Sequence, residues 1–264
     1  MAESTDPLVG RTILVTRPEG RSKGLLHMLE QVGACPVAWP TVAFETPLDP
    51  EPVHQAIASL SNYDWLVFTS HNGVAYFFSA LNAGSEVETM IPGRIAAIGP
   101  ATAETLVRRG VTVHLIAEES RSEGLAAGLC DSIGSGQRVL LIKPEKARDI
   151  IEKAVRGRGS ELDAVAFYRN VPAPGIDELA NAIIKGRYQM AVFSSPSTFT
   201  NLFAGPLVEL ATLIAALNRM AVVAIGPVTA EALKTAGVNP VTSAVVPTDE
   251  GILDALRTAK LPAV

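Results

Sequence analysis

Small polar residues gather in two turns that each follow a short apolar run, where a strand would end and a helix would begin. One turn holds Ser70, His71 and Asn72, and the other holds Ser195 and Ser197. A serine in the capping position satisfies the first amides of its helix and can also offer its hydroxyl to a ligand. Both turns are predicted to bind a carboxylate, with plain helix capping as the alternative for each serine.

A second pair of turns runs from Gly99 to Thr102 and from Gly226 to Thr229. Each contains a proline suited to the first helical position, so the amides after it point outward with the positive end of the helix dipole behind them. Thr102 and Thr229 are predicted to lie beside these amides and to help bind an anionic group. Capping of their own helices is the alternative here too.

Basic side chains stand at two further strand ends, Arg17 in Thr-Arg-Pro-Glu and Lys143 in Ile-Lys-Pro-Glu. Arginine grips a carboxylate with two parallel donors, whereas lysine acts as a mobile point charge. Both are predicted to bind substrate carboxylates, and the alternative is a surface cation paired with Glu19 or Glu145. His71 could donate a proton, although a lone histidine at a helix start is more often a solvated or capping residue.

The sequence carries no strong signature of a metal or cofactor site. Cys35 and Cys130 are the only cysteines and have no metal-ligand spacing. The stretch from Gly157 to Gly159 lacks the third glycine and the preceding strand of a dinucleotide fingerprint. We therefore predict an enzyme or binding protein without metal or cofactor.

All of these turns belong to a sequence repeat that defines the elements positioning them. Residues 95–111 and 222–238 are identical at ten of 17 positions. An offset of about 126 residues, give or take one, also aligns residues 67–70 with 192–195 and 14–19 with 140–145. The chain is thus interpreted as two copies of one unit. Gly110 and Gly237 each follow a helical run and are predicted to be helix caps rather than functional residues.

Apolar runs alternate with amphipathic stretches of about 8 to 15 residues, which is typical of parallel α/β sheets. Ligands bind such sheets where strands end and helices begin. The predicted strands are Thr12–Thr16, Trp65–Phe68, Ile95–Ile98, Val113–Ile116, Arg138–Ile142, Ala164–Tyr168, Ala191–Phe193, Ala221–Ile225 and Pro240–Thr242.

Length and composition place the chain among two-domain globular proteins, because 264 residues with 48% hydrophobic content can bury two ordinary cores. The net charge of −5 argues against a nucleic-acid binder. The most apolar stretch, Ala211 to Gly226, is too short and too polar to span a membrane. Met1 to Arg11 reads as a frayed leader without a secretory signal, so we expect a cytoplasmic protein.

Taken in order, several motifs resemble the uroporphyrinogen-III synthase family over nearly the whole chain. The resemblance rests on their order, spacing and total length, since each motif alone is only a strand-to-helix turn. The motifs are Val15-Thr-Arg-Pro18, Val67-Phe-Thr-Ser70, Ala97-Ile-Gly-Pro100 with Thr102-Ala103, Ala166-Phe-Tyr-Arg169, Val192-Phe-Ser-Ser195 and Ala224-Ile-Gly-Pro227 with Thr229-Ala230.

The resemblance implies two flavodoxin-like α/β lobes with the active site in the cleft between them. One lobe would contain residues 1–36 and 172–264, the other 42–166, and residues 37–41 and 167–171 would form a two-stranded connector. The implied reaction is cyclisation of the linear tetrapyrrole hydroxymethylbilane, with inversion of its last pyrrole ring, to uroporphyrinogen III and water.

By the same resemblance, Tyr168 would help the substrate hydroxyl to leave. A phenol with a pKa of about 10 stays protonated at neutral pH and can donate a hydrogen bond. The alternative is a tyrosine that only anchors the connector. The resemblance also implies a monomer that serves haem, sirohaem, cobalamin or chlorophyll synthesis and transiently contacts the preceding enzyme, hydroxymethylbilane synthase.

Two other classes of protein remain open from the sequence. A two-lobed binding or sensor protein would close on a small ligand without chemistry, and ligand turnover separates it from an enzyme. A sugar-nucleotide transferase with two α/β lobes should have a longer chain and acidic contacts for a metal or nucleotide, and nucleotide binding would support it.

Overall fold

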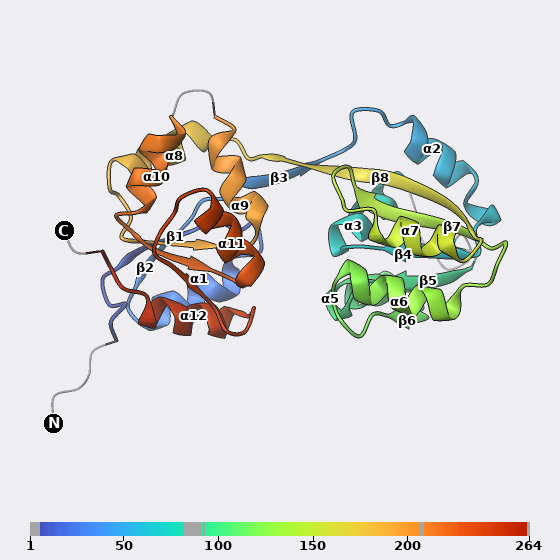
Figure 1. The fold of residues 1–264 in the computed structure, drawn as a ribbon, viewed down its shortest axis with the longest axis horizontal. Helices are drawn as coiled ribbons and strands as arrows, with labels where there is room; N and C mark the ends of the chain where they lie inside the picture. Colours follow the sequence, from blue (N-terminus) through green and yellow to red (C-terminus); the bar gives the residue numbers. More distant parts are fainter. Residues whose placement is uncertain (1–5, 82–90, 92, 206–208, 263–264) are drawn as a thin grey trace. The chain divides into compact units, whose positions relative to one another are not determined.

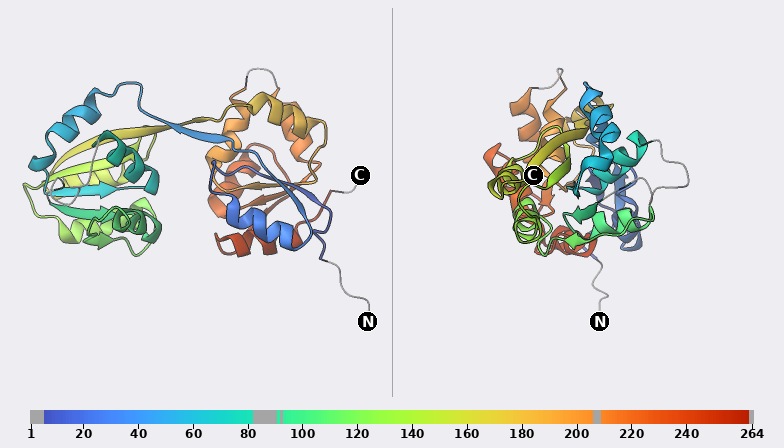
Figure 2. Two further views of the ribbon diagram at one scale, coloured as in Figure 1. Left: turned by 180° about the vertical axis from the view of Figure 1, so that it is seen from behind. Right: turned by 90° about the vertical axis from the view of Figure 1, so that its right-hand side faces the viewer.

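The structure is a computed structural model that describes residues 6–81, 91, 93–205 and 209–262. It divides into two compact units (Figures 1 and 2). Unit 1 comprises Met1–Ala43 and Val171–Val264, and unit 2 comprises Phe44–Asn170. The chain therefore passes between the units twice, once within β3 and once near the end of β8.

Unit 1 is built on a five-stranded parallel sheet with the order β11-β10-β9-β1-β2. Its strands are β1 (Thr12–Val15), β2 (Cys35–Ala38), β9 (Met190–Phe193), β10 (Ala221–Ala224) and β11 (Val241–Ser243). Its helices are α1 (Lys23–Gln31), α8 (Ile176–Ile184), α9 (Pro196–Thr200), the 3-10 turn η2 (Asn201–Phe203), α10 (Leu210–Leu217), α11 (Pro227–Thr235) and α12 (Asp249–Thr258).

Unit 2 contains a six-stranded sheet with the order β3-β8-β7-β4-β5-β6. Its strands are β3 (Val42–Glu45), β4 (Trp65–Phe68), β5 (Arg94–Ala97), β6 (Leu115–Ile116), β7 (Arg138–Pro144) and β8 (Glu161–Pro172). The helices that the structure describes in this unit are α2 (Glu51–Ala58), the 3-10 turn η1 (Leu60–Asn62), α3 (His71–Ala80), α5 (Pro100–Val107), α6 (Ser122–Ser132) and α7 (Ile150–Gly157).

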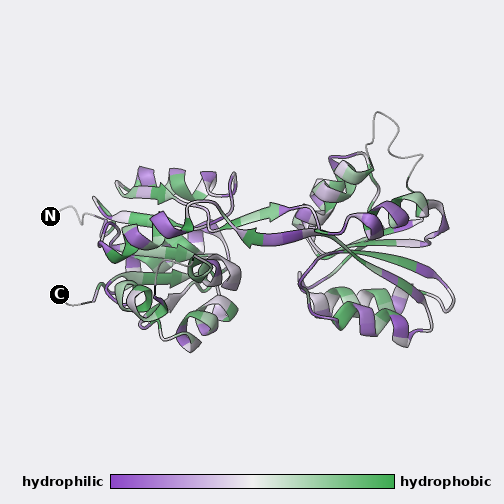
Figure 3. Ribbon diagram, turned by 90° about the horizontal axis from the view of Figure 1, so that it is seen from above, coloured by the Kyte–Doolittle hydropathy of each residue, from purple (hydrophilic) through white to green (hydrophobic). Residues whose placement is uncertain are grey.

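Helices cover both faces of each sheet (Figure 3), which is why β4, β9 and β10 are apolar at every position and β1 at every position after Thr12. In unit 1, Leu14 packs on the side of α8, α10 and α11, whereas Ile13 and Val15 pack on the side of α1 and α12. In unit 2, α2, α3 and α5 cover one face, and α6 and α7 cover the other. Each unit thus has two apolar cores.

The sequence repeat falls on equivalent strands of the two sheets. When the strands of unit 1 are numbered along the chain, their order from β2 to β11 is the flavodoxin-like 2-1-3-4-5. Unit 2 shows the same order from β8 to β6 when β7 is numbered first, β8 second, and β4, β5 and β6 third to fifth. The register agrees as well. The repeat aligns Val15 with Leu141 and Val192 with Val67, and the structure places Val15 opposite Val192 in unit 1 and Leu141 opposite Val67 in unit 2. The predicted parallel α/β fold is therefore confirmed, and duplication of one unit remains our interpretation.

The predicted connector and the observed strands differ in one place. Residues 37–41 were predicted to connect the lobes, but Val37 and Ala38 belong to β2 and pair with Leu14 and Val15. An edge strand tolerates Pro36, whose missing amide would break an inner ladder. β8 pairs with β7 on one side and with β3, which begins at Val42, on the other.

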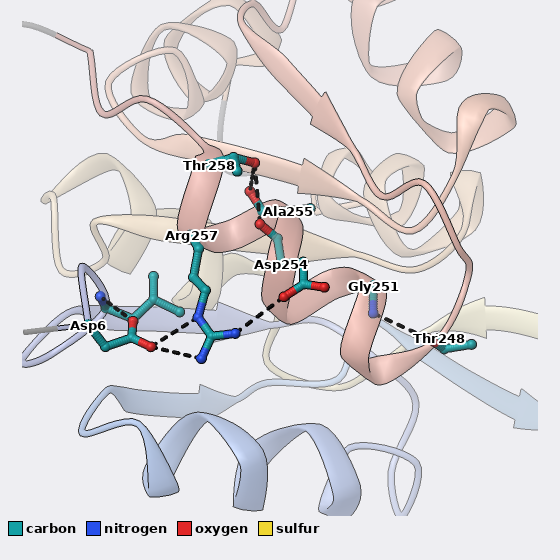
Figure 4. A network of polar contacts seen from close by, with 8 residues as sticks. Asp6, Thr248, Gly251, Asp254, Ala255, Arg257 and Thr258 are labelled. Atoms are coloured by element: carbon teal, nitrogen blue, oxygen red, sulfur yellow. Dashed lines mark hydrogen bonds and ion pairs between the residues drawn. The ribbon is translucent and has the colours of Figure 1, made fainter. Parts of the chain in front are cut away.

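The start of the described chain is held against unit 1, so residues 6–11 are not the frayed leader predicted from the sequence; residues 1–5 lie outside the described ranges. Leu8 is only 1% exposed. Arg257 of α12 donates to Asp6 through Nε at 2.9 Å and Nη2 at 2.8 Å (Figure 4). The burial of Leu8 and the ion pair from Asp6 to Arg257 were not visible in the composition of this segment.

Two smaller predictions can be checked against the backbone. Gly110 and Gly237 have φ values of 78° and 96° in the turns that end α5 and α11, two and one residues after the C-caps Arg108 and Ala236, which confirms that they are left-handed residues closing these helices. Within the described ranges, no helix is long and apolar enough to cross a membrane.

Candidate active site

Each unit has a topological switch point, where the connections leave neighbouring strands toward opposite faces of the sheet. In unit 1 it lies between β1 and β9, and in unit 2 between β7 and β4. Open parallel sheets bind ligands at the carboxyl ends of the strands beside such points. Arg17, Lys143, Ser70 and Ser195 all stand at these strand ends, so the sequence-predicted residues fall on the two switch points.

At the unit 1 switch point, Arg17 forms an ion pair with a carboxylate that the sequence did not suggest. Its Nη1 lies 2.5 Å from Oδ1 of Asp249, the first residue of α12. The Arg17 side chain is 11% exposed. The other carboxylate oxygen of Asp249, Oδ2, lies close to Gly24. A Cβ added to Gly24 would be only 2.8 Å from this oxygen, so glycine leaves room for the Asp249 side chain. Arg17 is therefore paired with Asp249 and not with Glu19.

Ser195, on the other side of this switch point, caps α9. Its Oγ accepts from the amide of Thr198 at 3.2 Å, and the Thr198 hydroxyl accepts from the amide of Ser195 at 3.2 Å. The Ser195 and Ser197 hydroxyls lie 2.9 Å apart. These contacts confirm the capping interpretation and leave a half-buried pair of hydroxyls at the strand end.

At the unit 2 switch point, Lys143 is also paired with a carboxylate. Its Nζ lies 2.6 Å from Oε1 of Glu152 on α7, with the two side chains 17% and 9% exposed. The second oxygen, Oε2, is buried without a hydrogen-bond partner among the described residues. The ion-pair partner of Lys143 is therefore Glu152, and not Glu145 as the alternative interpretation of the sequence expected. Lys143 neutralises a carboxylate that is almost fully removed from water.

Ser70 connects this switch point to Tyr168. Its Oγ accepts from the amide of Gly73 at 2.9 Å as the N-cap of α3, and it lies 2.8 Å from the Tyr168 hydroxyl. A Cβ on Gly73 would lie 3.2 Å from a methyl of Ile142 on β7, so glycine lets α3 begin close to that strand. The capping serine and the tyrosine proposed from the family resemblance are therefore one hydrogen-bonded pair.

Aromatic rings hold Tyr168 in place. The ring stacks on Tyr76 with centroids 5.6 Å apart and meets Phe44 edge-on at 5.9 Å. Tyr168 is 4% exposed. Burial, with a smaller contribution from Glu45, raises the pKa of Tyr76, which keeps that neighbouring phenol protonated at neutral pH. This packing fixes the direction of the Tyr168 hydroxyl.

The remaining predicted residues differ in exposure. His71 and Asn72 are half-buried at the start of α3. Thr102 and Thr229, expected beside outward amides, are each 3% exposed. Their side chains turn into the cores of their units, because the third position of α5 and α11 faces the sheet.

Sequence reasoning missed the long-range partners of the predicted residues. Asp249 lies 232 residues from Arg17, and Tyr168 lies 98 residues from Ser70. Acidic residues at the start of a helix are usual and gave no signal for Asp249. In the part of the chain that the structure describes, no three His, Cys, Asp or Glu side chains group as metal ligands would.

The strand order and the polar turns at both switch points define a doubly wound α/β protein with ligand-binding edges. The family model described as uroporphyrinogen-III synthase HemD matches residues 24–254. The chain belongs to the uroporphyrinogen-III synthase family, whose members act in tetrapyrrole biosynthesis.

Individual relatives agree with this assignment. A uroporphyrinogen-III synthase from Synechococcus elongatus is 30% identical over 203 residues, which are 76% of each chain. A porphyrin biosynthesis protein HemD from Ruminiclostridium josui is 30% identical over 86% of this chain, which spans only 44% of that relative's length. The structural match includes a crystal structure of a mutant uroporphyrinogen III synthase from the extreme thermophile Thermus thermophilus, with a TM-score of 0.63 and 25% sequence identity. The superposition covers 94% of this chain and 99% of that one.

Proposed function

We propose that this chain converts hydroxymethylbilane to uroporphyrinogen III and water, as a cyclising lyase that needs neither a metal nor a cofactor. The observation that carries the proposal is the family match over residues 24–254, a range that contains Ser70, Lys143, Tyr168 and Ser195 but begins after Arg17. The alternative of a binding or sensor protein without catalysis is not favoured by relatives that are synthases.

The chemistry of this reaction demands positioning more than reactive side chains. The substrate loses its terminal hydroxyl as water, and the carbon left behind must bond to the far pyrrole ring at the position that leads to a spirocyclic intermediate. Direct closure would give the symmetric type I isomer instead. Holding the chain in the productive shape supplies most of the required selectivity.

Carboxylate binding is assigned to the polar turns at the strand ends. The hydroxyls of Ser70, Ser195 and Ser197 support this assignment, because they are half-buried at the carboxyl ends of β4 and β9. His71 and Asn72 begin α3 beside Ser70. The buried threonines, Thr102 and Thr229, act by fixing the start of α5 and α11, and the neighbouring amides meet the ligand.

Tyr168 is proposed to donate a hydrogen bond to the departing hydroxyl. Its 2.8 Å contact with Ser70 supports this role, because the serine can accept the phenolic hydrogen bond at rest and keeps the phenol oriented at the strand end. A positioned weak acid of this kind contributes up to about 10²-fold to rate, the lower end of what general acids supply. The hydroxyl leaves as water, so no other reactant is needed.

The Arg17–Asp249 pair is expected to contribute to substrate affinity. Arg17→Ala should raise KM several-fold with little change in kcat, because it removes attraction to a carboxylate in both the ground state and the transition state. The effect should shrink as salt is added. Steady-state kinetics at two ionic strengths check this, with Arg108→Ala as the control, since Arg108 forms an exposed ion pair with Glu104 in unit 2. An equal KM for both variants would contradict a role for Arg17.

A cytoplasmic location, a monomeric state and transient contact with hydroxymethylbilane synthase remain proposals that accompany this function. The function itself is tested by incubating the protein with freshly made hydroxymethylbilane and resolving the product isomers.

A further inference from the structure

One loop in each unit has the same backbone but opposite side-chain chemistry. The loop after β11 leads to α12, and the loop after β6 leads to α6. They are equivalent because Ala244 donates its amide to Ala224 and Ala117 donates its amide to Ala97, in matching strands. Thr248 and Arg121 then occupy the same N-cap position, four residues after these alanines.

The helix that follows confirms the equivalence of the two loops. Gly251 and Gly124 are both the third residue of their helix, and both leave room for a loop carbonyl. A Cβ on Gly251 would lie 2.1 Å from the carbonyl oxygen of Val246, and one on Gly124 would lie 2.4 Å from that of Glu119. Figure 4 shows the unit 1 member of this pair, where Thr248 caps the amide of Gly251 at 3.2 Å.

The side chains on these matched backbones differ sharply. Unit 1 places Val245 and Val246 where unit 2 has Glu118 and Glu119. Val245 is 97% exposed and Val246 is 52% exposed. Since the same backbone forms with two glutamates, folding of the loop does not require the valines. Exposed apolar side chains that the fold does not need indicate a binding surface.

A third valine stands on the same edge of the unit 1 sheet. Val228, at the start of α11, is 73% exposed. It follows β10, and Val245 follows β11; these strands are parallel neighbours, so both turns lie at the carboxyl ends of strands about 5 Å apart. Asp249, the partner of Arg17, begins α12 three residues after Val246. We call Val228, Val245 and Val246 the unit 1 ledge.

We propose that the unit 1 ledge packs against pyrrole rings of the linear tetrapyrrole, and that the equivalent loop of unit 2, with Glu118 and Glu119, offers no such contact. This inference rests on the proposed function. The ligand combines flat apolar rings with carboxylate side chains. The ledge offers exposed methyl groups, and the Arg17 guanidinium is paired with Asp249, three residues after Val246. The equivalent loop of unit 2 would repel the same ligand through Glu118 and Glu119.

Val245→Glu, which installs the type of residue that unit 2 carries at this position, tests the ledge. KM for hydroxymethylbilane should rise about tenfold, since lost apolar contact in a binding site is worth that much or more. The turnover number should change little, because the contact is made before and during the reaction. Val245→Thr, which removes apolar character without adding charge, should raise KM by a smaller factor in the same direction.

Val107→Glu is the matched control, because Val107 is 60% exposed on α5 of unit 2 and the variant adds the same charge. Its KM should stay within about twofold of the wild type. Affinity for uroporphyrin III, the stable oxidised form of the product, is measured in parallel by fluorescence and needs no turnover. It should fall for Val245→Glu and not for Val107→Glu.

The outcomes separate the ledge from the reaction. If Val245→Glu matches Val107→Glu in both KM and porphyrin affinity while the wild type forms the type III isomer, the ledge is not a ligand contact. If the wild type forms no type III isomer, the proposed function fails, and porphyrin affinity alone then decides for or against the ledge. Equal thermal unfolding of the two variants shows that the loop still folds.

Discussion

Replacing Lys143 by methionine is expected to cost unit 2 about 3 kcal/mol of stability, because the change leaves the Glu152 carboxylate buried without its cation. The Glu152 side chain is 9% exposed, and its second oxygen already lacks a partner among the described residues. Urea unfolding followed by tryptophan fluorescence should report the loss, since Trp65 is buried in unit 2.

A second substitution separates a structural ion pair from a substrate-binding lysine. Lys143→Met combined with Glu152→Leu should recover most of the lost stability, because an apolar pair replaces a charged one of similar volume. If Lys143 instead binds substrate, the single variant keeps its stability and shows only a raised KM. That result would restore the role predicted from the sequence and contradict the structural one.

Tyr168→Phe is expected to lower turnover by roughly tenfold to a hundredfold, the lower end of what a positioned acid supplies. The phenyl ring would remain between Tyr76 and Phe44, so the loss isolates the hydroxyl that contacts Ser70. KM should move less than kcat, because the hydrogen bond to the departing group strengthens in the transition state. Single-turnover kinetics with fresh hydroxymethylbilane provide the measurement.

Tyr63→Phe is the control for this substitution. Tyr63 also lies in unit 2 and donates its hydroxyl to Asp163 at 2.6 Å, near the amino end of β4. Its loss should affect stability and leave turnover unchanged. A Tyr168→Phe variant with wild-type rate and wild-type isomer ratio would mean that Tyr168 only anchors β8.

Local sequence patterns predicted the strands and the turns well. Each of the nine predicted runs overlaps a strand. The inner strands were the clearest, because strands buried on both faces read as short, continuous apolar segments. The repeat identified the strand ends that matter, as at Ser70 and Ser195. The reach of β8 was underestimated: it spans Glu161–Pro172, and its polar alternate residues hid both ends of the strand.

Contacts between distant segments could not be predicted from the sequence. Asp249 and Glu152 pair with Arg17 and Lys143 only because their helices pack beside those strand ends. A single sequence does not show which of many carboxylates a given cation will meet. The exposed valines of the unit 1 ledge could have been found in the sequence. Val245 and Val246 are two adjacent valines in a turn, which departs from the polar composition expected of loops.

The isomer of the product is the most direct test of the central claim. Hydroxymethylbilane closes without an enzyme to the symmetric type I product, so a synthase is recognised by its ability to redirect closure. The purified protein, incubated briefly with freshly made hydroxymethylbilane and followed by oxidation and chromatography, should yield mainly the type III isomer with no metal or nucleotide added. Type I product alone, formed at the rate seen without protein, would contradict the assignment.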